Sequence, residues 1–150
     1  MTRMHVARSA LLMGCLAVAL GCGPLVTLPG GELSGSVTPT PSDWSFSDSV
    51  ETVQLETRPG DPYSVNVWGV GLGRYFFIAA ADPENRWASY MKADPNVRLR
   101  IADDLYELRA ELAESPAQRS AVLAAIKRKY DRELSEEETS RAVLFRLGPR

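Results

Sequence analysis

Residues 62–87 read PYSVNVWGVGLGRYFFIAAADPENRW, and this stretch decides the fold. Alternation predicts a strand over 63–68, because successive side chains of a strand point to opposite faces. One face is apolar and suits a core; it consists of Tyr63, Val65 and Val67. The other face is polar apart from one large aromatic, which suits the wall of a ligand site or a partner surface. Its residues are Ser64, Asn66 and Trp68.

The second half of this stretch predicts a hairpin and the start of a helix. Gly takes positive φ at little cost, so Gly71-Leu72-Gly73 is expected to form the turn. The following strand, 74–81, is almost wholly apolar, as a strand covered on both faces would be. Asp82-Pro83 is typical of a helix start, because Asp caps free N–H groups and Pro tolerates the first helical position. Arg86 and Trp87 are then expected in the first turn.

The rest of the chain continues as short strands joined by tight turns. Further strands are predicted at 50–58, 97–101, 106–112 and 142–147. The short helix is expected to end at Asp94-Pro95, and a longer helix to start at Ser115-Pro116. That helix has an apolar stripe at helical spacing, formed by Leu123, Ile126, Tyr130 and Leu134. Strands joined by tight turns pair antiparallel, and a small sheet manages its edges best by closing into a barrel.

The N-terminal segment is predicted to be an export signal. Residues 1–8 are basic, and Ser9–Leu20 is an apolar run that is too short for a comfortable membrane span. Ala19-Leu20-Gly21-Cys22 resembles a bacterial lipobox, so 1–21 is predicted to be a lipoprotein signal peptide and Cys22 the lipid attachment site. An ordinary cleaved signal and an N-terminal membrane anchor are the alternatives. All three place the domain outside the cytoplasm.

Residues 22–42 are predicted to form a flexible tether between the lipid and a single domain at 43–150. The segment GPLVTLPGGELSGSVTPTPS after Cys22 is rich in Gly, Pro, Ser and Thr and has no sustained period. It would hold the domain off a membrane surface in the cell envelope. Gly23 rather than Asp follows the cysteine, which in a Gram-negative cell favours the outer membrane.

Composition excludes several kinds of chemistry from the processed chain. The only histidine and both cysteines lie within residues 1–22. Processing at Cys22 would leave 15 of the 17 basic residues against 19 acids, which changes the net charge from −2 to −4. The processed chain would have no Cys or His nucleophile and no imidazole ligand, and we predict no metal site. The basic cluster at 127–132 is interpreted as a solvated face, so no nucleic acid is expected.

Between 44 and 150 the chain carries, in this order, ETRPGDPYSVNVWGV, an apolar strand, ENRW, a short helix ending in DP, VRLRI, LYELRAEL, a helix and LFRL. Together they resemble the flavin-binding split-barrel proteins, which include pyridoxamine-phosphate oxidase-like and deazaflavin-dependent nitroreductase-like groups. The resemblance implies a mainly β fold, a six-stranded antiparallel split β-barrel with flanking helices. It also implies a homodimer with FMN or a deazaflavin at the interface.

The resemblance also implies a cofactor site. Arg86 falls at the position of a phosphate-binding arginine, and Trp87 follows it where the better-matched flavin enzymes have lysine. The strand 64–69 would flank the ring system, where those enzymes carry basic residues at the positions of Ser64 and Gly69. The six candidate cofactor-binding residues are Arg86, Trp87, Asn66, Ser64, Trp68 and Arg58. No side chain stands out as a catalytic acid or base.

These residues also have structural interpretations, which the sequence leaves open. Arg86 is either a phosphate ligand or a partner in a salt bridge, and Arg58 is either functional or a solvated cap at a strand end. Trp68 and Trp87 offer flat surfaces to a ring, but they would also suit packing at a dimer interface.

Three functions follow from this sequence. The first is a lipid-anchored extracytoplasmic protein that binds a flavin or deazaflavin and acts as an oxidoreductase on a small molecule, with the cofactor supplying the chemistry. The second is a cofactor-free split barrel that works as a binding or interaction module of the envelope; the missing basic residues and the exported location favour it. The third, a haem-handling protein, is disfavoured by the lack of histidine, although tyrosine can ligate iron.

Overall fold

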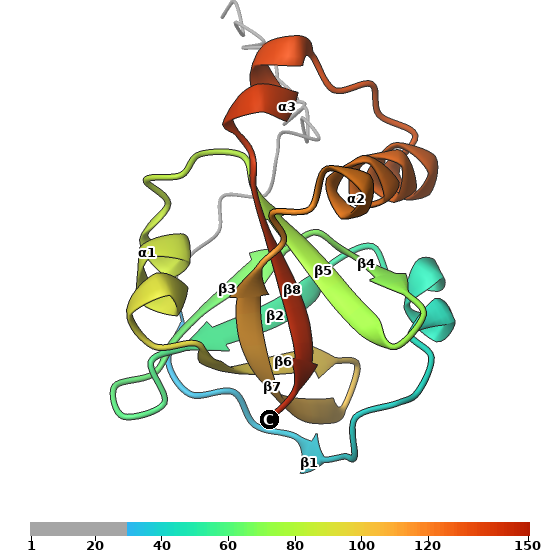
Figure 1. Cartoon of the computed structure of the whole chain (residues 1–150). Helices are drawn as coiled ribbons and strands as arrows, with labels where there is room; N and C mark the ends of the chain where they lie inside the picture. The colour runs from blue at the N-terminus through green and yellow to red at the C-terminus, as the bar shows by residue number, and fades with distance from the viewer. Residues whose placement is uncertain (1–29) are drawn as a thin grey trace, which may run out of the picture.

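The computed structural model describes residues 30–150, and one sheet organises them (Figure 1). Cys22, the predicted signal peptide and the first part of the predicted tether lie outside the described residues. The strands are β1 (Ser36–Val37), β2 (Val53–Thr57), β3 (Tyr63–Val67), β4 (Gly69–Leu72), β5 (Tyr75–Ala80), β6 (Asn96–Ile101), β7 (Asp104–Leu112) and β8 (Val143–Pro149). The helices are the 3-10 helix η1 (Ser45–Ser49), α1 (Arg86–Ala93), α2 (Pro116–Tyr130) and α3 (Glu136–Arg141).

Seven strands form one antiparallel path, in the order β3-β2-β6-β7-β8-β5-β4, and the short β1 pairs parallel with β7. β3 and β4 are the two ends of this path, although only Trp68 separates them in sequence. Because consecutive residues are close in space, the two end strands must approach each other at Trp68. The sheet therefore curls into a half-barrel. The predicted mainly β antiparallel split barrel with flanking helices is confirmed, but the path has seven strands and not six.

The extra strand arises because the predicted strand after Pro62 breaks at Trp68. Residues before the break pair with β2, as Val65 does with Leu55, and those after it pair with β5, as Val70 does with Phe77. The predicted hairpin turn at Gly71-Leu72-Gly73 is therefore wrong in position. Leu72 pairs with Tyr75, and the turn is Gly73-Arg74, where Gly73 has a φ of 56°.

Gly71 is required by a close contact and not by the turn. A Cβ at this position would lie 2.5 Å from both the Cβ and the carbonyl oxygen of Trp44. Trp44 is fully buried, and its ring contacts Phe76 and Tyr106, with centroids 5.4 and 4.9 Å away. This indole fills one end of the main core, and the strand that passes over it has no room for a side chain.

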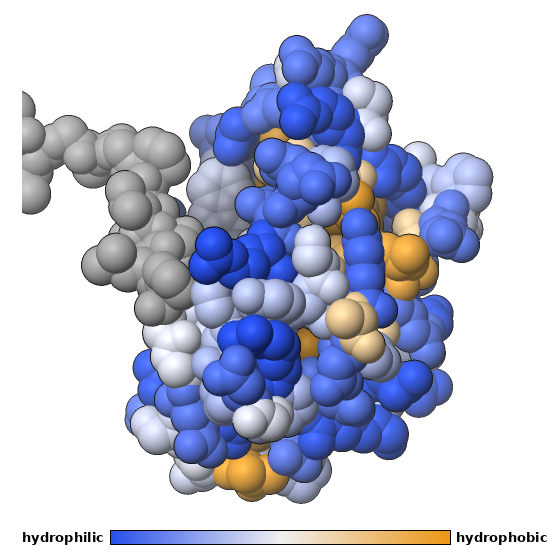
Figure 2. Space-filling view, turned by 90° about the vertical axis from the view of Figure 1, so that its left-hand side faces the viewer, coloured by the Kyte–Doolittle hydropathy of each residue, from blue (hydrophilic) through white to orange (hydrophobic). Residues whose placement is uncertain are grey.

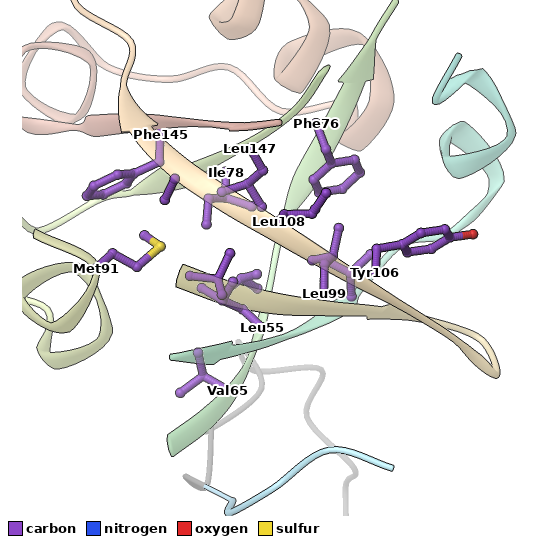
Figure 3. Packing of buried hydrophobic residues seen from close by; sticks show 14 of the residues in the cluster. Leu55, Val65, Phe76, Ile78, Met91, Leu99, Tyr106, Leu108, Phe145 and Leu147 are labelled. Atoms are coloured by element: carbon purple, nitrogen blue, oxygen red, sulfur yellow. The ribbon is translucent and has the colours of Figure 1, made fainter. Parts of the chain in front are cut away.

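The main core lies on the concave face of the sheet and is closed by α1 (Figure 3). It draws on every strand of the antiparallel path except β4. Alternation predicts the inward set of β6 correctly, since Val97, Leu99 and Ile101 are all buried. The largest fully buried side chains of this core include Trp44, Phe76, Phe145, Leu55, Ile78, Leu99, Leu108 and Leu147.

A second, smaller core lies between α2 and the outer face of the sheet. Its buried members are Val70, Phe77, Ala113, Val122, Ala125, Ile126 and Leu144. The other three residues of the predicted stripe, Leu123, Tyr130 and Leu134, pack against it while half-buried. The sheet is therefore covered on both faces where β5 runs, as its almost continuous apolar sequence indicates.

Residues 30–42, here called the N-terminal strap, lie along the outer face of the sheet. Gly30 exchanges backbone hydrogen bonds with Ser64 on β3 (2.8 and 3.0 Å). Ser36 donates to Asp103, just before β7, and Thr38 donates to Leu105 on β7 (both 3.0 Å). Leu33 is buried. The predicted flexible tether up to Ser42 differs from the structure here, because from Gly30 onward the segment is part of the domain.

The strap covers a buried ion pair. Glu56 is only 2% exposed, although alternation places it on the outer face of β2. Arg98 binds it with two parallel hydrogen bonds, Nε to Oε1 and Nη2 to Oε2, both 2.7 Å. The N–H of Leu33 donates to the same carboxylate. The hydrogen bond to Glu56 raises the pKa of Arg98 above its ordinary value, against the opposing effect of burial.

Among residues 30–150, no helix combines the length and the apolar character needed to cross a membrane. The longest is α2, with 15 residues, and one side of it faces the second core.

We predict that Gly71→Ala lowers the free energy of unfolding by about 2–3 kcal/mol, because the added methyl group must displace Trp44 or the strand. Urea unfolding at neutral pH measures this change. Gly60→Ala is the matched control, since a Cβ at Gly60 meets no atom within 4 Å. Equal losses in the two variants would contradict the close packing of Gly71.

We also predict that Glu56→Gln lowers the free energy of unfolding by about 3 kcal/mol, because it removes the buried countercharge of the Arg98 guanidinium and leaves only the exposed Glu32 carboxylate, 3.2 Å away. Glu107→Gln is the control: Glu107 pairs with Arg150 at the surface (3.5 Å), and such pairs contribute about 1 kcal/mol or less. The same urea experiment compares the two variants. A loss no larger for Glu56→Gln than for Glu107→Gln would refute the role given to the buried pair.

Candidate functional site

Helix α1 begins at Arg86 and not at the predicted Asp82-Pro83. Asp82 forms a tight turn instead: its Oδ1 accepts a hydrogen bond from the N–H of Glu84 (2.9 Å), and its carbonyl accepts one from the N–H of Asn85 (3.1 Å). Asn85 becomes the N-cap of α1. Arg86 and Trp87 still occupy the first turn of the helix, as predicted.

The Arg86 side chain is exposed and, among residues 30–150, has no ion-pair or hydrogen-bond partner. The salt-bridge interpretation of Arg86 therefore finds no partner in this part of the chain. Asn85 makes no side-chain hydrogen bond to the helix, so the first N–H groups of α1 are not capped by it. The acidic Asp82 nearby lies 3.9 Å from Arg141, which offsets part of its charge.

Trp87 and Arg58 have mainly structural contacts. The Trp87 ring is half-buried and packs on the main core, with its centroid 6.2 Å from that of Phe145. Arg58 follows the last residue of β2, has a φ of 55° and forms an ion pair with Asp61 (2.9 Å). Its guanidinium also lies 4.1 Å from the ring centroid of Tyr90 on α1, so it joins the turn after β2 to this helix.

The three residues predicted to form the wall of a ligand site, Ser64, Asn66 and Trp68, do not form one surface. Ser64 is buried beneath Gly30 of the strap, whereas Asn66 is exposed and makes no side-chain hydrogen bond within the described chain. The Trp68 ring stacks on Tyr130 of α2, with centroids 4.4 Å apart and planes 11° apart, and the Arg132 guanidinium lies 5.6 Å from its centroid. Trp68 therefore belongs to the α2 side of the molecule.

The end of α2 clamps the chain at the strand break. The Tyr130 hydroxyl accepts a hydrogen bond from the N–H of Gly69 (2.9 Å) and is 3.0 Å from the carbonyls of Glu51 and Gly69. The Lys129 ammonium donates to the carbonyls of Ser47 (2.9 Å) and Gly69 (2.7 Å). The N–H and the C=O of Gly69 are therefore both hydrogen-bonded to side chains of α2, which take the place of a neighbouring strand.

Burial shifts the titration of both clamp residues. Desolvation lowers the pKa of Lys129, which the charge of Asp48 opposes. Desolvation likewise raises the pKa of Tyr130 above its ordinary value of 10.0. The solvated face predicted for the basic run at 127–132 does not hold for Lys129, which is half-buried and hydrogen-bonded to two backbone carbonyls. The signal was the spacing of Val122, Ala125, Ile126 and Lys129, which places the lysine on the buried side of the helix.

A hollow of about 370 Å³ adjoins this clamp and is lined by Asp48, Ser49, Glu51, Trp68, Lys129, Tyr130 and Asp131. Of the predicted site residues, Trp68 alone lines one of the main hollows of the described chain. Figure 2 shows the side that carries α1, where hydrophobic residues reach the surface only in small separate patches. The six predicted residues therefore do not gather in one place: Arg86 and Trp87 lie on α1 and Arg58 packs against it, Ser64 is covered by the strap, Trp68 packs against α2, and Asn66 is exposed on β3.

Comparison with solved structures identifies the fold. A candidate pyridoxamine 5′-phosphate oxidase from Listeria innocua superposes with a TM-score of 0.55 at 15% identity, covering 67% of this chain and 84% of that one. A FAD-binding protein from Mesorhizobium loti gives 0.53 at 15% identity, covering 69% and 83%. The haem storage protein HutZ from Vibrio cholerae gives 0.57 at 18% identity, covering 70% and 85%.

This chain has the split-barrel fold. At these identities the likeness concerns architecture alone, and structures with the same architecture carry names that refer to flavin in one case and to haem in another. No model of a known protein family matches the sequence, and neither does any curated protein. Within residues 30–150, no three His, Cys, Asp or Glu side chains gather in an arrangement that could hold a metal ion.

We predict that Tyr130→Phe lowers the free energy of unfolding by about 1–2 kcal/mol at pH 7, because the hydroxyl bonds to Gly69 and Glu51 are lost. Since the folded pKa of Tyr130 is raised, its stabilising effect is complete below pH 10 and declines as the pH rises toward the folded pKa. Urea unfolding at pH 7 and above pH 10 should therefore show the wild-type advantage shrinking. An advantage that grows with pH would contradict the buried, neutral hydroxyl.

Proposed function

We propose that this chain is a lipid-anchored extracytoplasmic split-barrel protein that binds a flavin or deazaflavin nucleotide and acts as a small-molecule oxidoreductase. The observation that carries the proposal is Arg86, whose exposed guanidinium has no partner among residues 30–150 and stands at the start of α1. The split-barrel fold supports it, because at least one solved protein of this architecture is named for binding FAD.

The residues around Arg86 fit the phosphate end of such a nucleotide. Backbone N–H groups at a helix start attract anions, and an arginine fork binds phosphate oxygens well. Asp82 would oppose an anion, but its Oδ1 already accepts a hydrogen bond from the N–H of Glu84 and lies near Arg141. When bound, the flavin or deazaflavin would supply hydride or electron transfer to a small oxidant. The protein's own part is to bind and orient it.

The residues predicted to flank the ring fit less well. Ser64 is covered by the strap and the Trp68 ring is packed on Tyr130, so neither offers a free surface to a ring. Asn66 is the one member of that face that is exposed without a side-chain partner in the described chain. A second copy would have to complete the ring site, which agrees with the homodimer that the resemblance implies. We propose the homodimer on this ground.

The proposed location rests on the sequence. Lipidation at Cys22 would hold the protein in the cell envelope, at the outer membrane if the cell is Gram-negative. An exported flavoprotein would have to acquire its cofactor outside the cytoplasm or be exported with it.

The second candidate is a cofactor-free split barrel that binds a partner in the envelope. The specific observation in its favour is the N-terminal strap, which buries Ser64 and Glu56 on the outer face of the sheet. That face is thereby closed to a ligand at the position where the flavin enzymes of the resemblance carry a basic residue. The two candidates differ in whether α1 receives a phosphate.

The purified full-length chain decides between them. We expect a yellow protein that releases flavin on denaturation, or one that binds added FMN or deazaflavin in a fluorescence titration. Arg86→Ala should weaken this binding by about tenfold or more, because it removes a charged phosphate contact. Arg128→Ala is the control, since it removes the same charge from an exposed position on α2 that makes no ion pair in the described chain.

Two results would count against the flavin proposal. A colourless protein that binds neither cofactor would favour the interaction module. A cofactor affinity that is unchanged in Arg86→Ala would remove the phosphate assignment, even if the protein is yellow.

A further inference from the structure

A hollow lined by three arginines lies on the outer face of β5, β7 and β8. Its volume is about 280 Å³, and its lining consists of Arg74, Tyr75, Arg109, Glu111, Arg146, Gly148 and Pro149. Figure 1 places the β4–β5 turn, which carries Arg74, on the side of the barrel opposite α1. The hollow is therefore separate from the phosphate site proposed at Arg86.

The register of the strands places the Tyr75 ring directly against the backbone of β8 beside the hollow. Gly148 on β8 pairs with Arg109 on β7, and a Cβ at Gly148 would lie only 3.1 Å from the Tyr75 ring. Across the three neighbouring strands, Gly148 therefore lies between Tyr75 on β5 and Arg109 on β7. At Gly148 only backbone atoms line the hollow, and the other lining residues are larger.

The residues that line the hollow carry more positive than negative charge, since three are arginines and one is a glutamate. Arg146 is paired with Glu111, but Arg74 and Arg109 have no ion-pair or hydrogen-bonding partner for their side chains among residues 30–150. The next acid along β7, Glu107, pairs with Arg150. Two uncompensated guanidinium groups therefore face one small hollow on a chain whose net charge is −2. An exposed arginine is ordinarily solvated, but two of them beside a built hollow suit a dianion.

The Arg146 guanidinium and the backbone of the turn that carries Arg74 are held in place before any ligand binds. Trp44 donates two hydrogen bonds to the turn that carries Arg74, from its backbone N–H to Gly73 (3.0 Å) and from its indole to the Arg74 carbonyl (3.2 Å). The Arg146 guanidinium lies 4.7 Å from the centroid of the Tyr75 ring and is also fixed by Glu111. Such pre-organisation reduces the entropy cost of binding.

We propose that this hollow binds the phosphate group of a small phosphate ester. Guanidinium forks match phosphate oxygens in geometry, and the two unpaired charges match a dianionic monoester. A second hollow of about 380 Å³ shares Arg74 and Pro149 and is otherwise lined by Thr40, Pro41 and Ser42 of the strap. The organic part of the ester lies in this second hollow, beside the hydroxyl groups of the strap.

Calorimetric titration of the full-length chain in a neutral detergent tests the proposal, with inorganic phosphate and glycerol 3-phosphate as probes. We expect saturable binding of both, tighter for the ester, and a loss of about tenfold or more in Arg109→Ala. Arg109 is exposed on β7, so the variant should keep its fold, which circular dichroism checks. Arg128→Ala removes an equal charge outside the hollow and should bind as the wild type does.

The amide resonances of Tyr75 and Gly148 provide a second readout, since they should shift on titration in the wild type and not in Arg109→Ala. Flavin binding is tested by fluorescence with Arg86→Ala, whereas binding at this hollow is tested by the Tyr75 and Gly148 amides with Arg109→Ala, so failure of the flavin proposal and failure of this one can be told apart. The proposal is overturned if the wild-type chain shows no saturable binding. It is also overturned if Arg128→Ala weakens binding as much as Arg109→Ala does.

Discussion

The hydrogen bonds of one glycine hold the two ends of the barrel together. Gly69 follows the break at Trp68, where the chain leaves β3 at one end of the sheet and enters β4 at the other. An edge strand has polar backbone groups without a strand partner, and buried ones must find partners elsewhere. For Gly69 those partners are the Tyr130 hydroxyl and the Lys129 ammonium at the end of α2. The sheet can therefore stay split at this point without leaving the N–H or C=O of Gly69 unpaired, and the same bonds attach α2 to the barrel.

The N-terminal strap has a comparable effect on the opposite part of the sheet. It supplies the Leu33 N–H to the buried Glu56 carboxylate, which also binds Arg98, and it covers Ser64. The Glu56 carboxylate is thereby buried and hydrogen-bonded at both of its oxygens. The cost of desolvating it is offset by three hydrogen bonds in good geometry. The strap thus converts an open sheet face, which could have bound a ligand, into an internal contact of the domain.

The sequence predicted the individual strands and helices well, but it predicted poorly which distant segments of the chain contact one another. The alternation of Val97, Leu99 and Ile101 identified β6, and the fold class followed from tight turns and antiparallel pairing. The break at Trp68 was not predictable from alternation, because Trp68 continues the pattern of β3 and only the pairing of Gly69 with β5 reveals the change. Glu56 was expected on a solvated face, since its partner in the strap lies 23 residues earlier in the chain. For the candidate site, the placement of Arg86 in the first turn of α1 was predictable, whereas the burial of Ser64 and the stacking of Trp68 depended on distant segments.

If Cys22 carries a lipid, the backbone hydrogen bonds of Gly30 to β3 limit how far the barrel can lie from a bilayer. Eight residue steps separate Cys22 from Gly30, and at about 3.5 Å per step they span at most about 28 Å. With a lipid at Cys22, Gly30 would lie within about this distance of the lipid headgroups. Because Gly30 is bonded to β3, that edge would be drawn toward the lipid, and any substrate would have to approach from the aqueous side or along the membrane plane.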